Sequence, residues 1–374
     1  MISVDNKCIG CGACKDKCPI DCISIIRKDG QYIPVVEKEK CINCKQCENV
    51  CVAIHASKVN CHKTKRTYYG YAKAEDKRIA SSSGGIFYSI AEKFILDGGV
   101  VIGAAYDDRF NVHHIVVNNL EDLSLIRGSK YVESNLQSVF KVAEKILNNG
   151  EKVLFSGLPC QVGAIKLYLG KEYEKLFCCE IFCHGVPRSG IFAAYINEVE
   201  KKYGLVHGFN FRSKHYGWSK PAYEIDTESK KIIQQHKNNI YHLMFGAHVS
   251  LRDSCYECQF RKYERAADIS LGDFWGIENY YPNVITNRGV SAIMINTEKG
   301  QALLKNSEVY LESCKLSEIY DKNTWMIMNY EKPDYQKRFI SDFNSMSSRV
   351  FFRKYKIKYK VVDKIKRLVR SVLE

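Results

Sequence analysis

The strongest constraint on the fold is a pattern of four cysteines that occurs twice near the start of the chain. Successive cysteines of the first copy are three, three and four residues apart, and the same intervals recur 33 residues later. The residues are Cys8, Cys11, Cys14 and Cys18, followed by Cys41, Cys44, Cys47 and Cys51. The first residues have neither the basic start nor the apolar core of a signal peptide, so we expect a cytoplasmic protein with reduced thiols. The cysteines therefore indicate metal binding rather than disulfides.

The repeated spacing C-x2-C-x2-C-x3-C is typical of a ferredoxin that holds two [4Fe–4S] clusters. In such a run the first three cysteines bind one cluster, and the fourth opens a helix and points towards the other cluster. We therefore expect one cluster on Cys8, Cys11, Cys14 and Cys51, and a second on Cys41, Cys44, Cys47 and Cys18. Two zinc sites are the alternative, but zinc ligands usually come as C-x2-C pairs with a long gap between them. Asp29-Gly30 predicts a hairpin over the clusters, within a ferredoxin domain of residues 1–60.

Charge and hydropathy exclude some classes of protein. The chain has 374 residues with a formal net charge of +14, and residues 349–374 alone contain ten Lys or Arg against two acids. Because this tail supplies so much of the charge, we expect no nucleic-acid partner. No apolar run approaches the roughly 18 residues of a membrane span. A zinc-dependent nucleic-acid-binding protein remains an alternative interpretation of the charge and the cysteines.

From about residue 65 the pattern changes to alternating strands and helices. Buried strands are predicted at 98–105, 152–157, 176–182, 267–271 and 290–296, with helical spacing at 136–147 and near 300. The sequence thus predicts a two-part α/β (α+β) protein. A bacterial dicluster ferredoxin fold is followed by a larger mixed α/β domain over residues 65–340.

Six further cysteines are clustered in this larger domain. Cys178 and Cys179 fall inside a predicted strand, and we interpret them as packed side chains. Each of the others lies at a strand end or in a turn with Gly or Pro; these are Cys160, Cys183, Cys255 and Cys258. Four thiolates suffice for a third [4Fe–4S] cluster, and a structural zinc is the alternative. Catalytic residues stay unknown: His184 is the nearest candidate acid or base, and a hydrogen-bonded structural histidine is the alternative.

A serine and glycine segment, Ser81 to Gly85, precedes a helical pattern that begins at Ile86. Small residues at a helix N-terminus let a phosphate approach backbone N–H groups, and an exposed capped helix start explains the segment equally well. The chain has no Walker loop, no G-x-G-x-x-G and no G-x-S-x-G motif. The sequence therefore lacks the motifs that would indicate a P-loop protein, an ordinary Rossmann protein or an α/β-hydrolase.

Several stretches of the larger domain match the motifs of one family, in order along the chain. They are Ser82–Gly85, Gly128–Tyr131, Ser156–Gln161, Cys183–Pro187, Phe211–Lys214 with Tyr216–Trp218, Cys255–Cys258, and Ala267–Gly276. Together they resemble the β subunit of coenzyme F420 hydrogenase/dehydrogenase, in its form fused to an N-terminal dicluster ferredoxin.

The resemblance implies FAD, bound in the larger domain next to a [4Fe–4S] cluster. By matching motif, Cys160, Cys183, Cys255 and Cys258 would hold that cluster, and Ser83, Gly84, Gly85 and Lys130 would line the flavin. A flavin exchanges one or two electrons, so it belongs between a ferredoxin module and a two-electron partner. We therefore expect an iron–sulfur flavoprotein oxidoreductase that acts with a redox partner protein or a small organic electron donor or acceptor. The alternative is a non-catalytic electron-transfer subunit that serves a separate enzyme.

The last segment, residues 349–374, is predicted to be a basic tail. Apolar residues recur at helical spacing from Val361 to Val372 with cations between them, which predicts a basic amphipathic helix. Such a helix can lie on an anionic membrane surface as a peripheral contact, or dock on an acidic partner. The alternative is a terminal helix that packs on its own domain with a solvated charged face.

Overall fold

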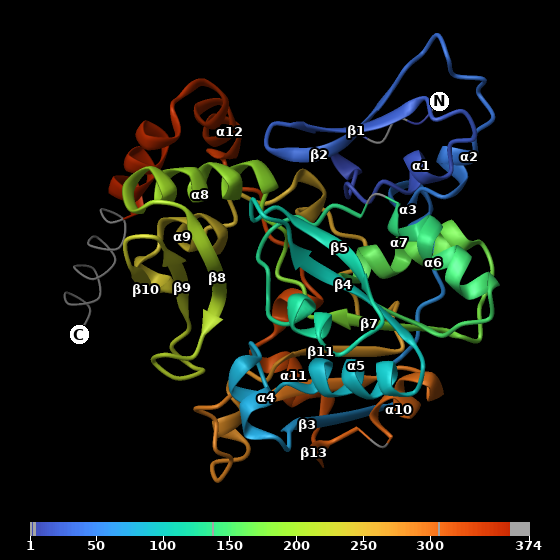
Figure 1. Cartoon of the computed structure of the whole chain (residues 1–374), viewed down its shortest axis with the longest axis vertical. Helices are drawn as coiled ribbons and strands as arrows, with labels where there is room; N and C mark the ends of the chain where they lie inside the picture. Colours follow the sequence, from blue (N-terminus) through green and yellow to red (C-terminus); the bar gives the residue numbers. More distant parts are fainter. Residues whose placement is uncertain (1, 3–4, 137, 306, 360–374) are drawn as a thin grey trace.

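The computed structural model describes residues 2, 5–136, 138–305 and 307–359. Its centre is an eight-stranded mixed sheet in the order β13-β3-β12-β11-β7-β6-β4-β5 (Figure 1). Neighbours from β4 to β11 are parallel, and all other neighbours are antiparallel. The strands are β3 (Arg66–Ala72), β4 (Val100–Tyr106), β5 (Val112–Val117), β6 (Val153–Gly157), β7 (Leu176–Ile181), β11 (Ile269–Asp273), β12 (Ser291–Ile295) and β13 (Val309–Ser313).

Five of these strands coincide with predicted ones, and each end lies within two residues of its prediction: β4, β6, β7, β11 and β12. These strands could be predicted from the sequence because strands covered on both faces are nearly continuous apolar runs. Consecutive residues of such a strand point to opposite faces, so Phe155 joins the core on one face and Leu154 the core on the other. Cys178 and Cys179 divide in the same way, and both are fully buried. Their packing agrees with the interpretation of both as core side chains.

Helices cover the two faces of the sheet (Figure 1). Side chains of α6 and α7 belong to the core on one face, and those of α5 and α10 to the core on the other. The predicted helices at 136–147, after Gly85 and near 300 correspond to α6, α5 and α10. The helices of the larger domain are α4 (Glu75–Ala80), α5 (Ile86–Leu96), α6 (Val139–Asn148), α7 (Pro159–Leu169), α8 (Ser189–Tyr203), α9 (Ile240–Gly246), α10 (Glu298–Leu304), α11 (Leu316–Asp321) and α12 (Gln336–Ser345).

A smaller antiparallel sheet lies beside the main one (Figure 1). Its strands are β8 (Val206–Ser213), β9 (Ala222–Thr227) and β10 (Lys231–Gln235). An aromatic core joins it to α8, α9 and α12, with Phe192, Phe211 and Tyr241 at its centre. None of these three strands was among the predicted ones.

The N-terminal region has the predicted hairpin, formed by β1 (Ile23–Lys28) and β2 (Gln31–Val36). Asp29 and Gly30 form its turn with φ of 52° and 77°. Three one-turn helices carry the cysteine runs: α1 (Ala13–Asp16), α2 (Gln46–Asn49) and α3 (Val52–His55). Cys51 caps α3 as predicted, but Cys18 is followed by a turn rather than a helix. The turn after Cys18 leads directly into β1, and Asp21 within it has φ of 49°, outside the helical range.

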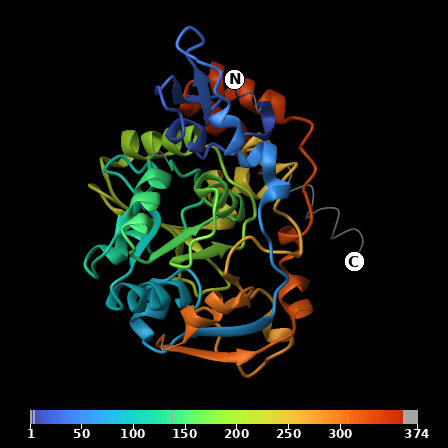
Figure 2. The same cartoon turned by 90° about the vertical axis from the view of Figure 1, so that its right-hand side faces the viewer.

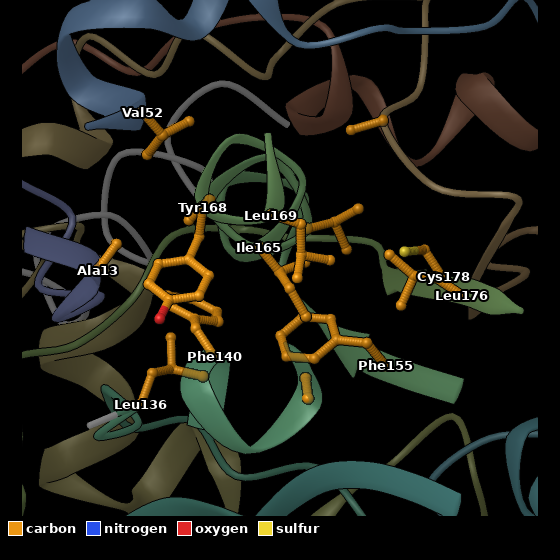
Figure 3. Packing of buried hydrophobic residues seen from close by; sticks show 14 of the residues in the cluster. Ala13, Val52, Leu136, Phe140, Phe155, Ile165, Tyr168, Leu169, Leu176 and Cys178 are labelled. Atoms are coloured by element: carbon orange, nitrogen blue, oxygen red, sulfur yellow. The ribbon is translucent and has the colours of Figure 1, made fainter. Parts of the chain in front are cut away.

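The N-terminal region and the larger domain share one hydrophobic core. Ala13 and Val52 pack in the same cluster as Phe140 and Tyr168 of α6 and α7, and Figure 3 shows these side chains converging. A Cβ atom at Gly163 would lie 2.6 Å from Phe260 and 3.2 Å from Val52, so glycine permits this close packing. The hairpin lies at the end of the molecule opposite β3 and β13 (Figure 2).

Residues 348–359 form a further helix, which packs on the aromatic core. Phe351 and Tyr355 are 1% and 2% exposed and contact Phe339 of α12. Lys354 pairs with Asp342, so this part of the predicted tail is a packed helix. The amphipathic helix predicted from Val361 to Val372 lies outside the described residues. None of the described helices has the length and hydrophobicity of a membrane span.

Candidate functional site

The eight N-terminal cysteines line two hollows of about 20 Å³ each, one per set of four. Cys8, Cys11, Cys14 and Cys51 line the first hollow, and we name them the inner thiol set. Cys18, Cys41, Cys44 and Cys47 line the second, together with Cys22, and we name those four the outer thiol set. Each set thus combines three cysteines of one run with the fourth of the other, in the arrangement that the spacing predicts.

The two cysteine runs share a backbone conformation. Gly10 and Gly12 have φ of 71° and 76°, and Asn43 and Lys45, 33 residues later, have φ of 54° and 60°. Positive φ turns the N–H groups of the loop inward, and the N–H of Gly10 donates to Cys8 Sγ at 3.4 Å. Glycine adopts this conformation freely, whereas lysine does so only when its surroundings enforce it. The conformation of the second run therefore follows from the fold rather than from its residue types.

The remaining four candidate ligands surround a cavity of about 260 Å³. They are Cys160, Cys183, Cys255 and Cys258, which we name the body thiol set. Burial, and then the neighbouring thiols, raise the pKa of Cys183 to about 11, that of Cys255 to about 12, and that of Cys160 well above its ordinary value. Thiolates held this close repel one another unless a cation joins them, so the donor set fits a metal centre.

The same cavity is also lined by the N-terminal region, through Ile9, Val52 and Ala53. Cys11 of the inner thiol set is near enough to Cys160 to raise its pKa further. No cysteine of the outer thiol set lines this cavity, and Cys44 of that set is exposed at the surface. The inner set therefore faces the body thiol set, and the outer set faces away from it.

Two observations bear on what the cavity can hold. Among the described residues, no three His, Cys, Asp or Glu side chains converge on the position of a single metal ion. In the same part of the chain, the buried Nε of Arg252, which lines the cavity, finds no hydrogen-bond acceptor. Thiols arranged around a hollow, beside a cation, fit a cluster whose four thiolates leave it with a net negative charge.

The four predicted flavin contacts come together elsewhere, and of these described residues none lines the thiol cavity. The N–H of Ser129 donates to Ser82 Oγ at 2.8 Å, which joins the loop of Lys130 to the loop of Ser83. Gly84 is required by packing, since a Cβ atom there would lie 2.5 Å from the carbonyl oxygen of Gly70. Gly85 caps α5 with φ of 86°.

Lys130 is a partly buried cation at this junction. Its Nζ donates to the carbonyl oxygens of Leu125, Arg127 and Gly128, at 3.0 to 3.4 Å. Burial lowers the pKa of Lys130 to about 7. These three hydrogen bonds shape the loop of residues 125–131, which the hydrogen bond from Ser129 joins to the Ser82 loop.

Further polar residues at this junction were missed by the sequence interpretation. Arg212 donates to the carbonyl oxygen of Ser82 at 3.4 Å and pairs with Asp273 at 2.7 Å. Lys214 donates to the carbonyl oxygen of Ser83 at 2.7 Å, and Trp218 donates to Asp273 at 2.8 Å. All of these residues belong to the family motifs quoted in the sequence analysis, so those motifs could have identified them as candidate site residues.

His184 lies next to the body thiol set in an aromatic environment. Its ring packs edge-on against Phe245, Trp325 and Tyr330, at centroid distances of 5.1 to 5.3 Å. Burial lowers the pKa of His184 to about 4. The neutral imidazole is therefore the favoured form in the folded protein.

Comparison with known proteins assigns these regions to two protein families. Residues 150–319 match the family described as the C terminus of the beta subunit of coenzyme F420 hydrogenase/dehydrogenase, and residues 7–53 match the 4Fe-4S dicluster domain. The coenzyme F420-dependent sulfite reductase of Methanocaldococcus jannaschii is 25% identical over 341 residues, which is 88% of this chain and 50% of that protein. The F subunit of the F420H2 dehydrogenase of Methanosarcina mazei is 25% identical over 195 residues, 48% of this chain and 55% of that protein.

The chain thus spans about half the length of these two curated relatives. A chain of the F420-reducing [NiFe] hydrogenase complex from Methanosarcina barkeri aligns with a TM-score of 0.49 at 16% identity, over 75% of this chain and 92% of that chain. The dicluster match implies two [4Fe–4S] clusters in the N-terminal region. With both matches in sequence order, residues 150–319 belong to the coenzyme F420 hydrogenase/dehydrogenase β-subunit family, an oxidoreductase family, and a 4Fe–4S dicluster domain at residues 7–53 precedes them.

Proposed function

We propose that this chain is an iron–sulfur flavoprotein oxidoreductase with three [4Fe–4S] clusters and FAD. The inner and outer thiol sets hold the two clusters of the dicluster domain, at residues 1–60. The body thiol set holds the third cluster within a domain of residues 65–340, and residues 349–374 form the C-terminal segment. The clusters supply one-electron transfer, and FAD supplies the exchange between one-electron and two-electron chemistry.

One observation carries the proposal: the dicluster domain forms part of the wall of the cavity of the body thiol set, and Cys11 and Cys160 pack against the same hydrophobic core. Inner and body thiol sets therefore face one another across the interface of the two domains. A structural zinc site would have no need of this position. The arrangement supports a redox role for the third site, and zinc is the alternative that metal analysis tests.

The flavin is assigned to the junction of the Ser82 and Lys130 loops. Three basic side chains, Lys130, Arg212 and Lys214, donate to backbone carbonyl oxygens of this junction. Arg212 is already paired with Asp273, and burial lowers the pKa of Lys130 and of Lys214 to about 7, so an anionic phosphate would favour the protonated form of both lysines. The phosphates of FAD are anions, and cations beside backbone N–H groups favour them. Ser83, Gly84, Gly85 and Lys130 remain the proposed contacts.

The substrate is proposed to be a small organic molecule that exchanges two electrons. Both curated relatives carry F420 in their names, which makes this deazaflavin the first compound to test. One relative is named as a subunit of a dehydrogenase, and this favours a second candidate function. In that case the chain is an electron-transfer subunit whose partner completes the reaction.

Anaerobic purification with metal, sulfide and flavin analysis tests the proposal. Three clusters require about twelve iron and twelve sulfide per chain, with one FAD. Eight iron with one zinc would overturn the third cluster and leave the dicluster domain intact. Reduction of F420 or a viologen by the isolated chain would distinguish the oxidoreductase from the non-catalytic subunit.

A further inference from the structure

Arg252 lies between the inner and body thiol sets and contacts the surroundings of both. It lines the cavity of the body thiol set and is 2% exposed. From there its Nη2 donates to the carbonyl oxygen of Cys8 at 2.8 Å and to that of Tyr32 at 3.0 Å. One guanidinium group therefore reaches from the body cavity to the backbone of an inner ligand.

The charge of Arg252 is balanced by a carboxylate that is equally buried. Glu133 is 2% exposed and forms an ion pair with Arg252. Its oxygens also accept from the N–H of Tyr32, at 3.1 and 3.2 Å, and from Ser189 Oγ at 3.2 Å. The pair thus ties the larger domain to the second strand of the hairpin.

The ligand loop of the inner set packs directly on this pair. A Cβ atom at Gly10 would lie 2.8 Å from both Arg252 Nη1 and Glu133 Oε1. Glycine at this position is therefore required by the ion pair as well as by the loop conformation.

We propose that the Arg252–Glu133 pair sets the reduction potentials of the inner and body clusters while holding the two ligand loops in register. The inference rests on the proposed function, because it requires the body thiol set to hold a cluster. A reduced cluster carries one more negative charge than an oxidised one, so a nearby buried cation favours the reduced form and a nearby anion the oxidised form. The two partners thus act in opposite directions on both clusters.

A second buried arginine at the same cavity serves as a comparison. Arg265 lines the cavity, pairs with Glu180 and is 1% exposed; within the described residues its other side-chain hydrogen bond is to the carbonyl oxygen of Lys262. It therefore reaches the body cavity and not the inner ligand loop. Lys332, at the rim of the cavity and 39% exposed at its side chain, is the solvent-screened comparison.

The experiment is an anaerobic redox titration of the full-length holoprotein, monitored by EPR. The variants are Arg252→Met, Arg252→Lys, Glu133→Gln and the double variant Arg252→Met/Glu133→Gln. Arg252→Met should lower the potentials of the inner and body clusters, because Glu133 is left uncompensated. Glu133→Gln should raise both, and the double variant should return them towards the wild type. Arg252→Lys keeps the charge and should shift them less than Arg252→Met.

The outer cluster is the internal control and should keep its potential in every variant. Arg265→Met should move the body cluster alone, and Lys332→Met should move none. Unchanged inner and body potentials in both Arg252→Met and Glu133→Gln, or an equal shift of all three clusters, would overturn the inference. If the wild type holds only eight iron, the proposed third cluster fails instead, and the inner cluster alone still decides the role of the pair.

Discussion

The N–H of Gly190 donates a hydrogen bond to the carbonyl oxygen of Gly30 at 2.8 Å, which ties the start of α8 to the turn of the N-terminal hairpin. A Cβ atom at Gly190 would lie 2.7 Å from Gly30 Cα, a contact with rigid backbone. We expect Gly190→Ala to lower the free energy of unfolding by about 1–3 kcal/mol, because the added methyl group must push the hairpin away. Urea unfolding followed by tryptophan fluorescence measures the change.

Gly246 is the matched control for this substitution. It closes α9, and a Cβ atom there would have no atom of the described residues within 4 Å. Gly246→Ala should leave the unfolding midpoint unchanged or raise it slightly. Equal midpoints for the two alanine variants would show that the hairpin contact is not tight.

If the body thiol set holds a cluster, substitution of one of its cysteines should remove the iron of that cluster alone. Cys160→Ala removes one of four ligands, and we expect iron to fall from about twelve to about eight atoms per chain while the dicluster signals persist. Cys178→Ala is the control, because Cys178 is fully buried in the core and outside every thiol set. A protein with Cys160→Ala that keeps all of its iron would remove Cys160 from the ligands.

If FAD binds at the proposed junction, a variant there should lose FAD without losing iron. Lys130→Met removes a cation and frees the three carbonyl oxygens that shape the loop of residues 125–131. We expect this variant to lose most of its flavin and to keep its clusters, measured as flavin and iron per chain. Lys171→Met is the control, since Lys171 is exposed. Flavin at the wild-type level in Lys130→Met would argue against the junction as the site.

Because His114 is buried, we expect the free energy of unfolding to depend on pH. It is 6% exposed, and burial lowers its pKa to about 4, below the ordinary value of 6.5. The unfolded chain therefore binds the proton more readily, so the free energy of unfolding falls as the pH drops from about 6.5 to 4. This group alone accounts for a fall of about 3 kcal/mol.

A variant isolates this effect from the other titrating groups. His114→Gln should lose about 3 kcal/mol less than the wild type between pH 7 and pH 4, when both are unfolded in urea. His207→Gln controls for the loss of a histidine from an exposed position. If the wild type and His114→Gln differ by a constant amount at all pH values, the His114 assignment is wrong.

The C-terminal segment predicts binding to anionic vesicles. Truncation at Ser348 would expose Phe339 of α12, which Phe351 and Tyr355 cover, so the informative variant ends at Tyr359. Residues 360–374 contain five Lys or Arg against two acids, and each cation near an anionic surface contributes about 1 kcal/mol. We expect full-length protein, but not the truncated chain, to sediment with phosphatidylserine vesicles at low salt. Equal sedimentation of both chains would exclude residues 360–374 as the anchor.

The cysteine runs were predictable because ligand spacing is local: Cys8 to Cys18 and Cys41 to Cys51 each span eleven residues, so the ligand pattern is recognisable without knowledge of the fold. The buried strands β4, β6 and β7 were predictable for the same reason, as continuous apolar runs. β3 and the smaller sheet were not, because their positions depend on partners far along the chain. The Arg252–Glu133 pair belongs to no motif, and only the long-range folding of the larger domain brings the two side chains together, since both backbones bond to residues 186–187.

Ala13 and Val52 belong to the same core as Phe140, so the dicluster domain is not a carrier on a tether. A tethered carrier must diffuse between its donor and its acceptor, and its rate depends on solvent viscosity and on linker length. Here the separation of the inner and body thiol sets is fixed when the chain folds. The rate of electron exchange between them should therefore not change when glycerol or sucrose is added. Only the encounter of the outer set with an external partner should become slower as the solvent viscosity rises.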